Sequence, residues 1–164
     1  MLGRVGGHRV ETLMLARQTF TRPTSTRRLP GIARLALGME VFLTIGALYG
    51  GGSLILAPDG HLLGIPVSLL AGTPFRSFLV PGICLLVFVG VAPLVAVAIT
   101  VRRLSAAPLA AAAVGLTLIG WVSVEMVALA GLGSLAWAFY LVLGTSIAAV
   151  GVAWWLSRSL NASD

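Results

Sequence analysis

Two glutamates lie inside long apolar segments of this sequence, and they have the clearest capacity for chemistry. Glu40 falls in the segment 35–56 and Glu125 in the segment 108–130. An ionisable side chain in a lipid-embedded segment is costly, so each is a candidate for proton coupling, an ion pair or a packing contact. At 1.5 Å per helical residue the two lie about 15 Å apart along a bundle, which argues against a shared proton or metal site.

Glu125 is predicted near the end of its segment, beside the loop 57–76. Its candidate ion-pair partners are therefore Arg76 and His61 of that loop. His61 has no second histidine or cysteine at ligand spacing, so no metal site is expected there.

Glu40 lies closer to the opposite end of the predicted bundle. Its candidate partners are the arginines of that end, if a side chain can reach inward: Arg34, Arg102 and Arg103. Both a structural role, as a paired or protonated carboxyl that fixes helix packing, and a role in proton coupling stay open for the two glutamates.

Known catalytic patterns are missing from the sequence. It contains no serine–histidine–aspartate set, no glycine-rich phosphate loop and no CxxC pair, and its single cysteine, Cys84, lies within an apolar segment. A lone buried cysteine behaves as a small apolar side chain and forms no disulfide framework. We therefore predict a protein that is not an enzyme and that holds no metal or cofactor.

The elements that position these residues are membrane spans. From Ser77 to Val101 the chain has no charged side chain, and Arg102 and Arg103 follow directly. A bilayer core needs about 20 apolar residues in a helix. Hydrophobic residues make up 58% of the 164 positions and charged residues 10%, against about 25% charged in soluble domains. The sequence thus predicts an all-α membrane protein, with a four-helix transmembrane domain over residues 35–157 and spans at 35–56, 78–101, 108–130 and 135–156.

Charge placement predicts the orientation. The arm 1–34, the pair at 102–103 and the tail 158–164 carry arginines on one side of the membrane, whereas Arg76 stands alone on the other. Because arginine and lysine accumulate in cytoplasmic segments, both termini are expected in the cytoplasm of a multi-pass protein of the bacterial inner membrane.

The loop between the first two spans has turn and helix signals of its own. Pro58-Asp59-Gly60 predicts a tight turn. Pro66 suits a helix start and Gly72 a helix stop, so we expect a short helix on the outer face or over the bundle. In the second span, Pro93 is expected to kink the helix.

The basic arm 1–34 suits an anionic lipid surface. Val10, Leu13, Met14 and Phe20 fall on one face of an interfacial amphipathic helix, although a disordered tail explains the composition equally well. The arginines expected to contact lipid headgroups are Arg9, Arg17, Arg27 and Arg28. The net charge of +6 is not arranged as a folded basic face, so nucleic acid is not expected as a partner.

Gly46 and Gly50 form a GxxxG pair in the first span. Such spacing allows close approach of a neighbouring helix in lipid. The neighbour is either another helix of the bundle or a helix of a partner protein.

Five short runs between residues 46 and 82 are distinctive: Gly46-Ala47-Leu48-Tyr49-Gly50-Gly51, Pro58-Asp59-Gly60, Leu63-Gly64-Ile65-Pro66, Leu69-Leu70-Ala71-Gly72-Thr73-Pro74-Phe75-Arg76 and Phe78-Leu79-Val80-Pro81-Gly82. They resemble a group of small four-span proteins of high-GC bacteria, actinobacteria above all, and the similarity covers residues 35–130. The resemblance implies fold and source but no activity. For a mycobacterial source, analogy suggests an accessory subunit of an envelope lipid-transport assembly.

The run Leu37-Gly38-Met39-Glu40-Val41 has a second, more limited resemblance, to small multidrug-resistance transporters, which carry a membrane glutamate in the first of four spans. This chain departs from them in its arm, its long loop and the lack of aromatic residues around Glu40.

Two functions follow as hypotheses. The first is a non-catalytic accessory or scaffold subunit of a larger membrane protein complex. The alternative is a small proton-coupled transporter that uses Glu40.

Overall fold

The computed structural model describes residues 29–128 and 134–160, and all of the long elements in these ranges are helices. Within these ranges, four helical segments are long and apolar enough to cross a membrane: α2 (Gly31–Leu56), the segment Leu79–Val101, α5 (Ala107–Ala128) and α6 (Ser134–Leu160). This confirms the predicted all-α class with four spans. The first helix begins four residues earlier than predicted, directly after Pro30, whose fixed φ suits the start of a helix.

The second span is not a uniform α-helix. It comprises α3 (Leu79–Leu85), the π-helical segment η3 (Leu86–Val91) and α4 (Ala92–Val101). Pro93 follows the π-segment and is buried. Proline lacks an N–H donor and its ring clashes with the carbonyl one turn earlier, so a wider π turn at this place relieves the clash.

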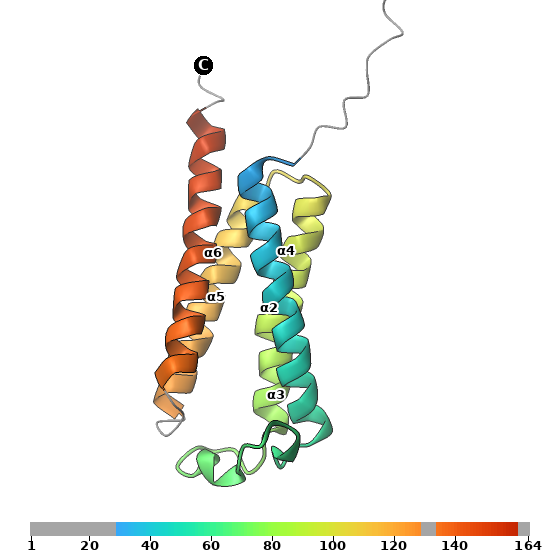
Figure 1. Cartoon of the computed structure of the whole chain (residues 1–164), viewed down its shortest axis with the longest axis vertical. Helices are drawn as coiled ribbons and strands as arrows, with labels where there is room; N and C mark the ends of the chain where they lie inside the picture. The colour runs from blue at the N-terminus through green and yellow to red at the C-terminus, as the bar shows by residue number, and fades with distance from the viewer. Residues whose placement is uncertain (1–28, 129–133, 161–164) are drawn as a thin grey trace, which may run out of the picture.

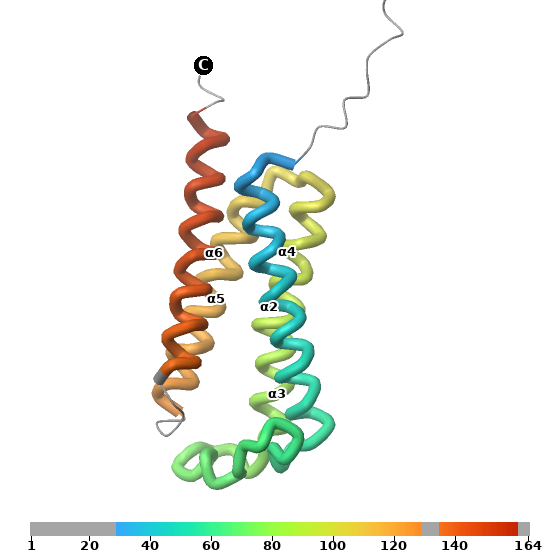
Figure 2. The backbone as a smooth tube through the Cα atoms, in the orientation of Figure 1, coloured from blue at the N-terminus to red at the C-terminus, as the bar shows by residue number. Residues whose placement is uncertain are grey.

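The helices are antiparallel neighbours in two pairs (Figure 1). One pair is α2 with the span α3–η3–α4, and the other is α5 with α6. At one end α2 and α5 begin and α4 and α6 end; we call this the terminal end (Figure 2). The opposite end carries the segment 57–78, and we call it the loop end.

Glycines bring α5 and α6 into backbone contact. A Cβ atom at Gly115 of α5 would lie 2.8 Å from the Cα of Ala148, and one at Gly151 of α6 would lie 2.8 Å from the Pro108 carbonyl oxygen. Gly144 lies one turn before Ala148 on α6, and a Cβ there would lie 3.0 Å from the Gly115 carbonyl oxygen. Small residues allow this approach, and the approach provides the van der Waals contact that holds helices together in lipid.

The other pair packs in the same way through Gly51 of α2 and Gly82 of α3. A Cβ at Gly82 would lie 2.7 Å from the Cβ of Leu54, and one at Gly51 would lie 3.0 Å from the Gly82 carbonyl oxygen. The predicted GxxxG pair has no such role inside the bundle, because a Cβ at Gly46 would meet nothing within 4 Å and one at Gly50 only a leucine methyl at 3.6 Å. The two glycines lie on a more open part of the α2 surface, so a role toward a partner helix stays a prediction.

The loop is folded against the loop end of the bundle. Two short 3-10 helices, η1 (His61–Leu63) and η2 (Val67–Leu70), lie in it, the second within the stretch where a short helix was predicted. Phe78 and Leu70 are buried against Leu54 of α2, and the Phe78 amide donates to the Pro58 carbonyl at 2.7 Å. Gly60 has a φ of 81°, a left-handed conformation that glycine adopts without strain.

At the terminal end, a buried cluster that contains Trp154 joins all four spans. Trp154 is 3% exposed and forms the cluster with Ala33 of α2 and Ala107 of α5, and the partly buried Ile99 of α4 packs against it. The Arg158 guanidinium lies over its ring, 5.1 Å from the centroid. The sequence alone does not predict this contact, since a tryptophan near a span end is equally typical of the lipid interface. Its neighbour Trp155 takes that exposed position.

Three sets of predictions lie outside the described residues. These are the amphipathic arm with the lipid contacts of Arg9, Arg17, Arg27 and Arg28, the end of the third predicted span at 129–130, and residues 161–164 of the predicted tail.

The glycine contact predicts a clear difference between two α5 glycines. Gly115→Ala should destabilise the protein by about 1–3 kcal/mol, because the added methyl overlaps the α6 backbone. Gly120→Ala should be neutral or stabilising, since a Cβ there meets nothing within 4 Å and alanine favours the helix. Thermal unfolding of both variants in mild detergent measures the difference. Equal midpoints would contradict the packing described.

Candidate functional site

Glu40 lies in the interior of the bundle. Its side chain is 0% exposed, on the buried face of α2 that also carries Ala36, Leu43 and Ala47. Neither carboxyl oxygen has a hydrogen-bond partner among the described residues. The hydroxyl of Thr44 donates instead to the backbone carbonyl of Glu40, at 2.9 Å. A buried carboxyl without a hydrogen-bond donor costs free energy, so protonation of Glu40 or the binding of a donor would lower this cost.

Thr100 of α4 is the second buried polar residue without a side-chain partner in the described part of the chain. It is 1% exposed and its hydroxyl oxygen makes no hydrogen bond. It lies in the last turn of α4, on the terminal half of the bundle, as Glu40 does on α2. The terminal half of the bundle therefore contains two buried polar side chains, Glu40 and Thr100, whose oxygens make no hydrogen bond to the described residues.

Glu125 has a different environment. It is partly buried on α5, and its Oε1 accepts a hydrogen bond from the indole Nε1 of Trp121, one turn earlier, at 2.7 Å. Residues four apart lie above one another on a helix, so the spacing itself brings the two side chains together. The hydrogen bond fixes the direction of the carboxylate.

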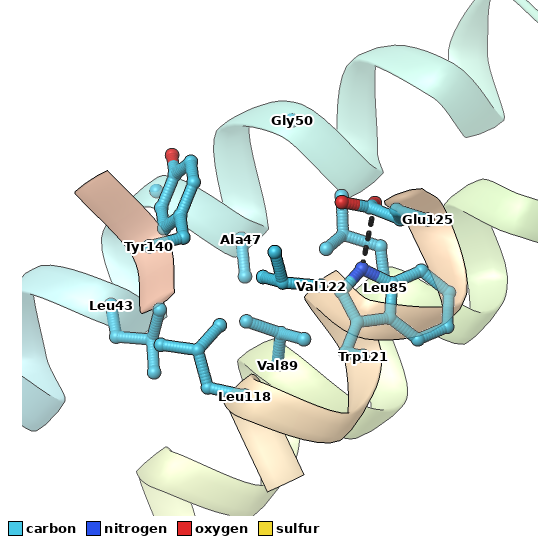
Figure 3. Close-up of a pocket in the computed structure, with 11 residues that line it drawn as sticks. Leu43, Ala47, Gly50, Leu85, Val89, Leu118, Trp121, Val122, Glu125 and Tyr140 are labelled. Atoms are coloured by element: carbon cyan, nitrogen blue, oxygen red, sulfur yellow. Dashed lines mark hydrogen bonds between the residues drawn. The ribbon is translucent and has the colours of Figure 1, made fainter. Parts of the chain in front are cut away.

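A cavity of about 130 Å³ lies beside this pair (Figure 3). Its walls come from α2, the second span, α5 and α6, and are mostly apolar: Leu43, Gly46, Ala47, Gly50, Leu85, Val89, Leu118, Trp121, Val122, Glu125 and Tyr140. Tyr140 and Glu125 lie on opposite sides of it (Figure 3). Because Gly46 and Tyr140 are exposed, the cavity opens between α2 and α6.

Glu40 does not line this cavity. It lies one turn from Leu43, which closes the cavity on that side, and ten residues, or about 15 Å, from Gly50 at the loop end. The expectation that the two glutamates form separate sites agrees with this geometry.

The predicted ion pairs are not formed. Within the described residues the only ion pair joins His61 and Asp59, with Nδ1 and Oδ1 2.6 Å apart. That hydrogen bond lowers the pKa of the Asp59 carboxyl. His61 therefore pairs with its loop neighbour and not with Glu125, while Arg76 is exposed. Arg34, Arg102 and Arg103 are also exposed, at the terminal end, and Glu40 lies about 14 Å along α2 from its first residue, too deep for them to pair with it here.

The two aromatic residues of the cavity, Trp121 and Tyr140, were not predicted from the sequence as site residues. Trp121 could have been found, because its spacing of four from Glu125 places it on the same face of a helix. Tyr140 gave no comparable signal, since it comes from another span and meets the cavity only through the packing of α6.

Comparison with models of known protein families, with characterised proteins and with solved structures finds no significant match.

The unpartnered carboxyl predicts the effect of an apolar replacement. Glu40→Met should leave stability unchanged or raise it, by up to about 3 kcal/mol, because it removes a buried polar group that has no hydrogen bond to lose. Thermal unfolding in detergent is the measurement. Leu43→Ala is the control, and it should destabilise by about 2–5 kcal/mol as a cavity-forming change at a buried site. A loss of several kcal/mol in Glu40→Met would mean that Glu40 has a partner.

Proposed function

We propose that this chain is a non-catalytic accessory subunit of a larger protein complex in the bacterial inner membrane. The main observation in support is the exposed surface of α6. In the spanning window of α6 only 17% of residues are buried, against 39% for α5, so one neighbouring helix takes most of its packing. Much of α6 faces lipid or a partner.

The exposed side of α6 has the chemistry of a helix-docking surface. Leu141, Val142, Thr145, Ser146 and Ala149 line a shallow, open hollow along it. The Thr145 hydroxyl donates to the Leu141 carbonyl at 2.8 Å and the Ser146 hydroxyl to the Val142 carbonyl at 2.7 Å. Small residues permit close approach of another helix in lipid. The two hydroxyls do not oppose it, because each already donates a hydrogen bond within its own helix.

The charged residues support an orientation for this subunit. Arg34, Arg102, Arg103 and Arg158 all lie at the terminal end, whereas Arg76 lies in the loop. We infer that the terminal end faces the cytoplasm. There the basic arm 1–34 would bind anionic lipid or an acidic subunit. The loop, with its 3-10 helices, would then cover the outer face. An envelope lipid-transport assembly of an actinobacterium is the setting suggested by the sequence resemblance.

Docking through α6 predicts that a bulky residue in the hollow expels the partner. Ala149→Trp should reduce stoichiometric co-purification from native membranes in mild detergent at least about tenfold, which corresponds to about 1.4 kcal/mol. Mass spectrometry of a tagged pull-down identifies and quantifies what is lost. Leu116→Trp, at a 63% exposed site on α5, is the matched control and should keep the complex. A lone monomer or homodimer for the unaltered protein would overturn the proposal.

A small proton-coupled transporter is the second candidate, and one observation favours it. Glu40 is fully buried between the helices and has no side-chain partner among the described residues, as expected of a carboxyl that exchanges a proton for a substrate. The scaffold role gives no reason to keep such a group, since an apolar side chain would fill the site at lower cost.

The transporter hypothesis predicts that Glu40→Gln abolishes transport and leaves assembly intact. In proteoliposomes with an imposed pH gradient, ethidium uptake and the proton counterflow reported by entrapped pyranine should fall to the level of protein-free liposomes. Glu125→Gln tests whether the loss is specific to the site at Glu40. Unchanged coupled flux in Glu40→Gln, or none above background in the unaltered protein, would reject this role.

A further inference from the structure

We propose that the cavity between α2, the second span, α5 and α6 binds a small organic cation, an ammonium group that carries an apolar substituent. Glu125 supplies the opposing charge. This inference is independent of docking through α6, because the cavity and the outer hollow share no residue.

The size and lining of the cavity define the apolar part of the ligand. A volume of about 130 Å³ is close to that of an engineered apolar cavity of about 150 Å³ that takes up benzene. Leu43, Ala47, Leu85, Val89 and Leu118 make up much of the wall. A group of the size of a phenyl ring or a branched alkyl fits this space, and the opening between α2 and α6 admits it.

The charge of the ligand follows from what faces Glu125. Among the described residues no arginine or histidine lines the cavity, and the hydrogen bond that the structure gives the carboxylate is the one from Trp121, at 2.7 Å. One neutral donor does not balance a carboxylate in an apolar wall, and a cation does. A divalent metal is a poor fit, since Ca²⁺ takes six to eight oxygen ligands and the cavity offers one carboxylate and one phenol.

Aromatic rings extend this preference to alkylated ammonium groups. Trp121 and Tyr140 both line the cavity, and Tyr140 lies across from Glu125 (Figure 3). Ring faces attract cations and are especially suited to quaternary ammonium groups, whose charge lies under methyl groups. Phe42 and Phe139, in edge contact at 6.3 Å, add apolar surface where α2 meets α6.

Two sources supply this chemistry, a free amine and the headgroup of an aminophospholipid. The test uses tritiated benzyltrimethylammonium and the full-length protein in dodecyl maltoside, a neutral detergent without amines. Scintillation proximity measures binding, and neopentylbenzene, the neutral carbon isostere, serves as competitor. We expect saturable binding that the isostere displaces at least about tenfold less well than the unlabelled cation. Displacement by added phosphatidylethanolamine assigns the site to a lipid headgroup, and its absence assigns it to a free amine.

Three variants locate the binding. Glu125→Gln keeps the shape of the side chain and removes its charge, and should weaken binding at least about tenfold. Gly46→Leu fills the cavity from α2, where an added Cβ meets nothing within 4 Å, and should do the same with Glu125 in place. Asp59→Asn removes a carboxylate from the exposed loop, outside the lining, and should bind like the unaltered protein. Circular dichroism and gel filtration confirm that each variant is folded.

The proposal is overturned by any of three results. They are no saturable binding up to about 10 mM, equal displacement by the neutral isostere, or unchanged affinity in both Glu125→Gln and Gly46→Leu.

Discussion

Backbone contact between α5 and α6 is the interaction on which the rest of this structure depends. Lipid tails are as apolar as leucine, so helices in a bilayer gain little from hiding apolar surface and must gain contact instead. Gly115, Gly144 and Gly151 provide it by letting the two backbones meet. The paired helices then act as one wall, from which Trp121 and Glu125 of α5 and Tyr140 of α6 enter the cavity.

The second pair is built by the same means, with Gly51 against Gly82, and the features of functional interest lie where the pairs meet. The buried cluster that contains Trp154 joins the pairs at the terminal end. Toward the loop end, the cavity lies between the two pairs. Glu40 lies between the two regions, buried and without a donor in the described chain. The helices therefore pack more extensively within each pair than between the pairs.

The three sites proposed here use different surfaces. Glu40 belongs to the closed interior, the cation cavity opens sideways between α2 and α6, and the docking hollow lies on the outer side of α6. A subunit that binds a partner through α6 leaves the cavity free, so an organic cation or lipid headgroup can occupy it within the assembled complex. The π-segment before Pro93 places Val89 on the cavity wall and so joins the irregular part of the second span to this site.

The sequence by itself determined the number, length and order of the spans, because a bilayer requires about 20 apolar residues and internal hydrogen bonding in each crossing. It also identified Glu40 and Glu125, since charge is conspicuous in such segments. Only the tertiary structure decided which side of each helix faces inward. In a span that is apolar all round, the pattern of residues does not specify rotation about the helix axis. The packing glycines therefore proved to be Gly51, Gly115 and Gly151 and not Gly46, and Glu125 met Trp121 and not Arg76.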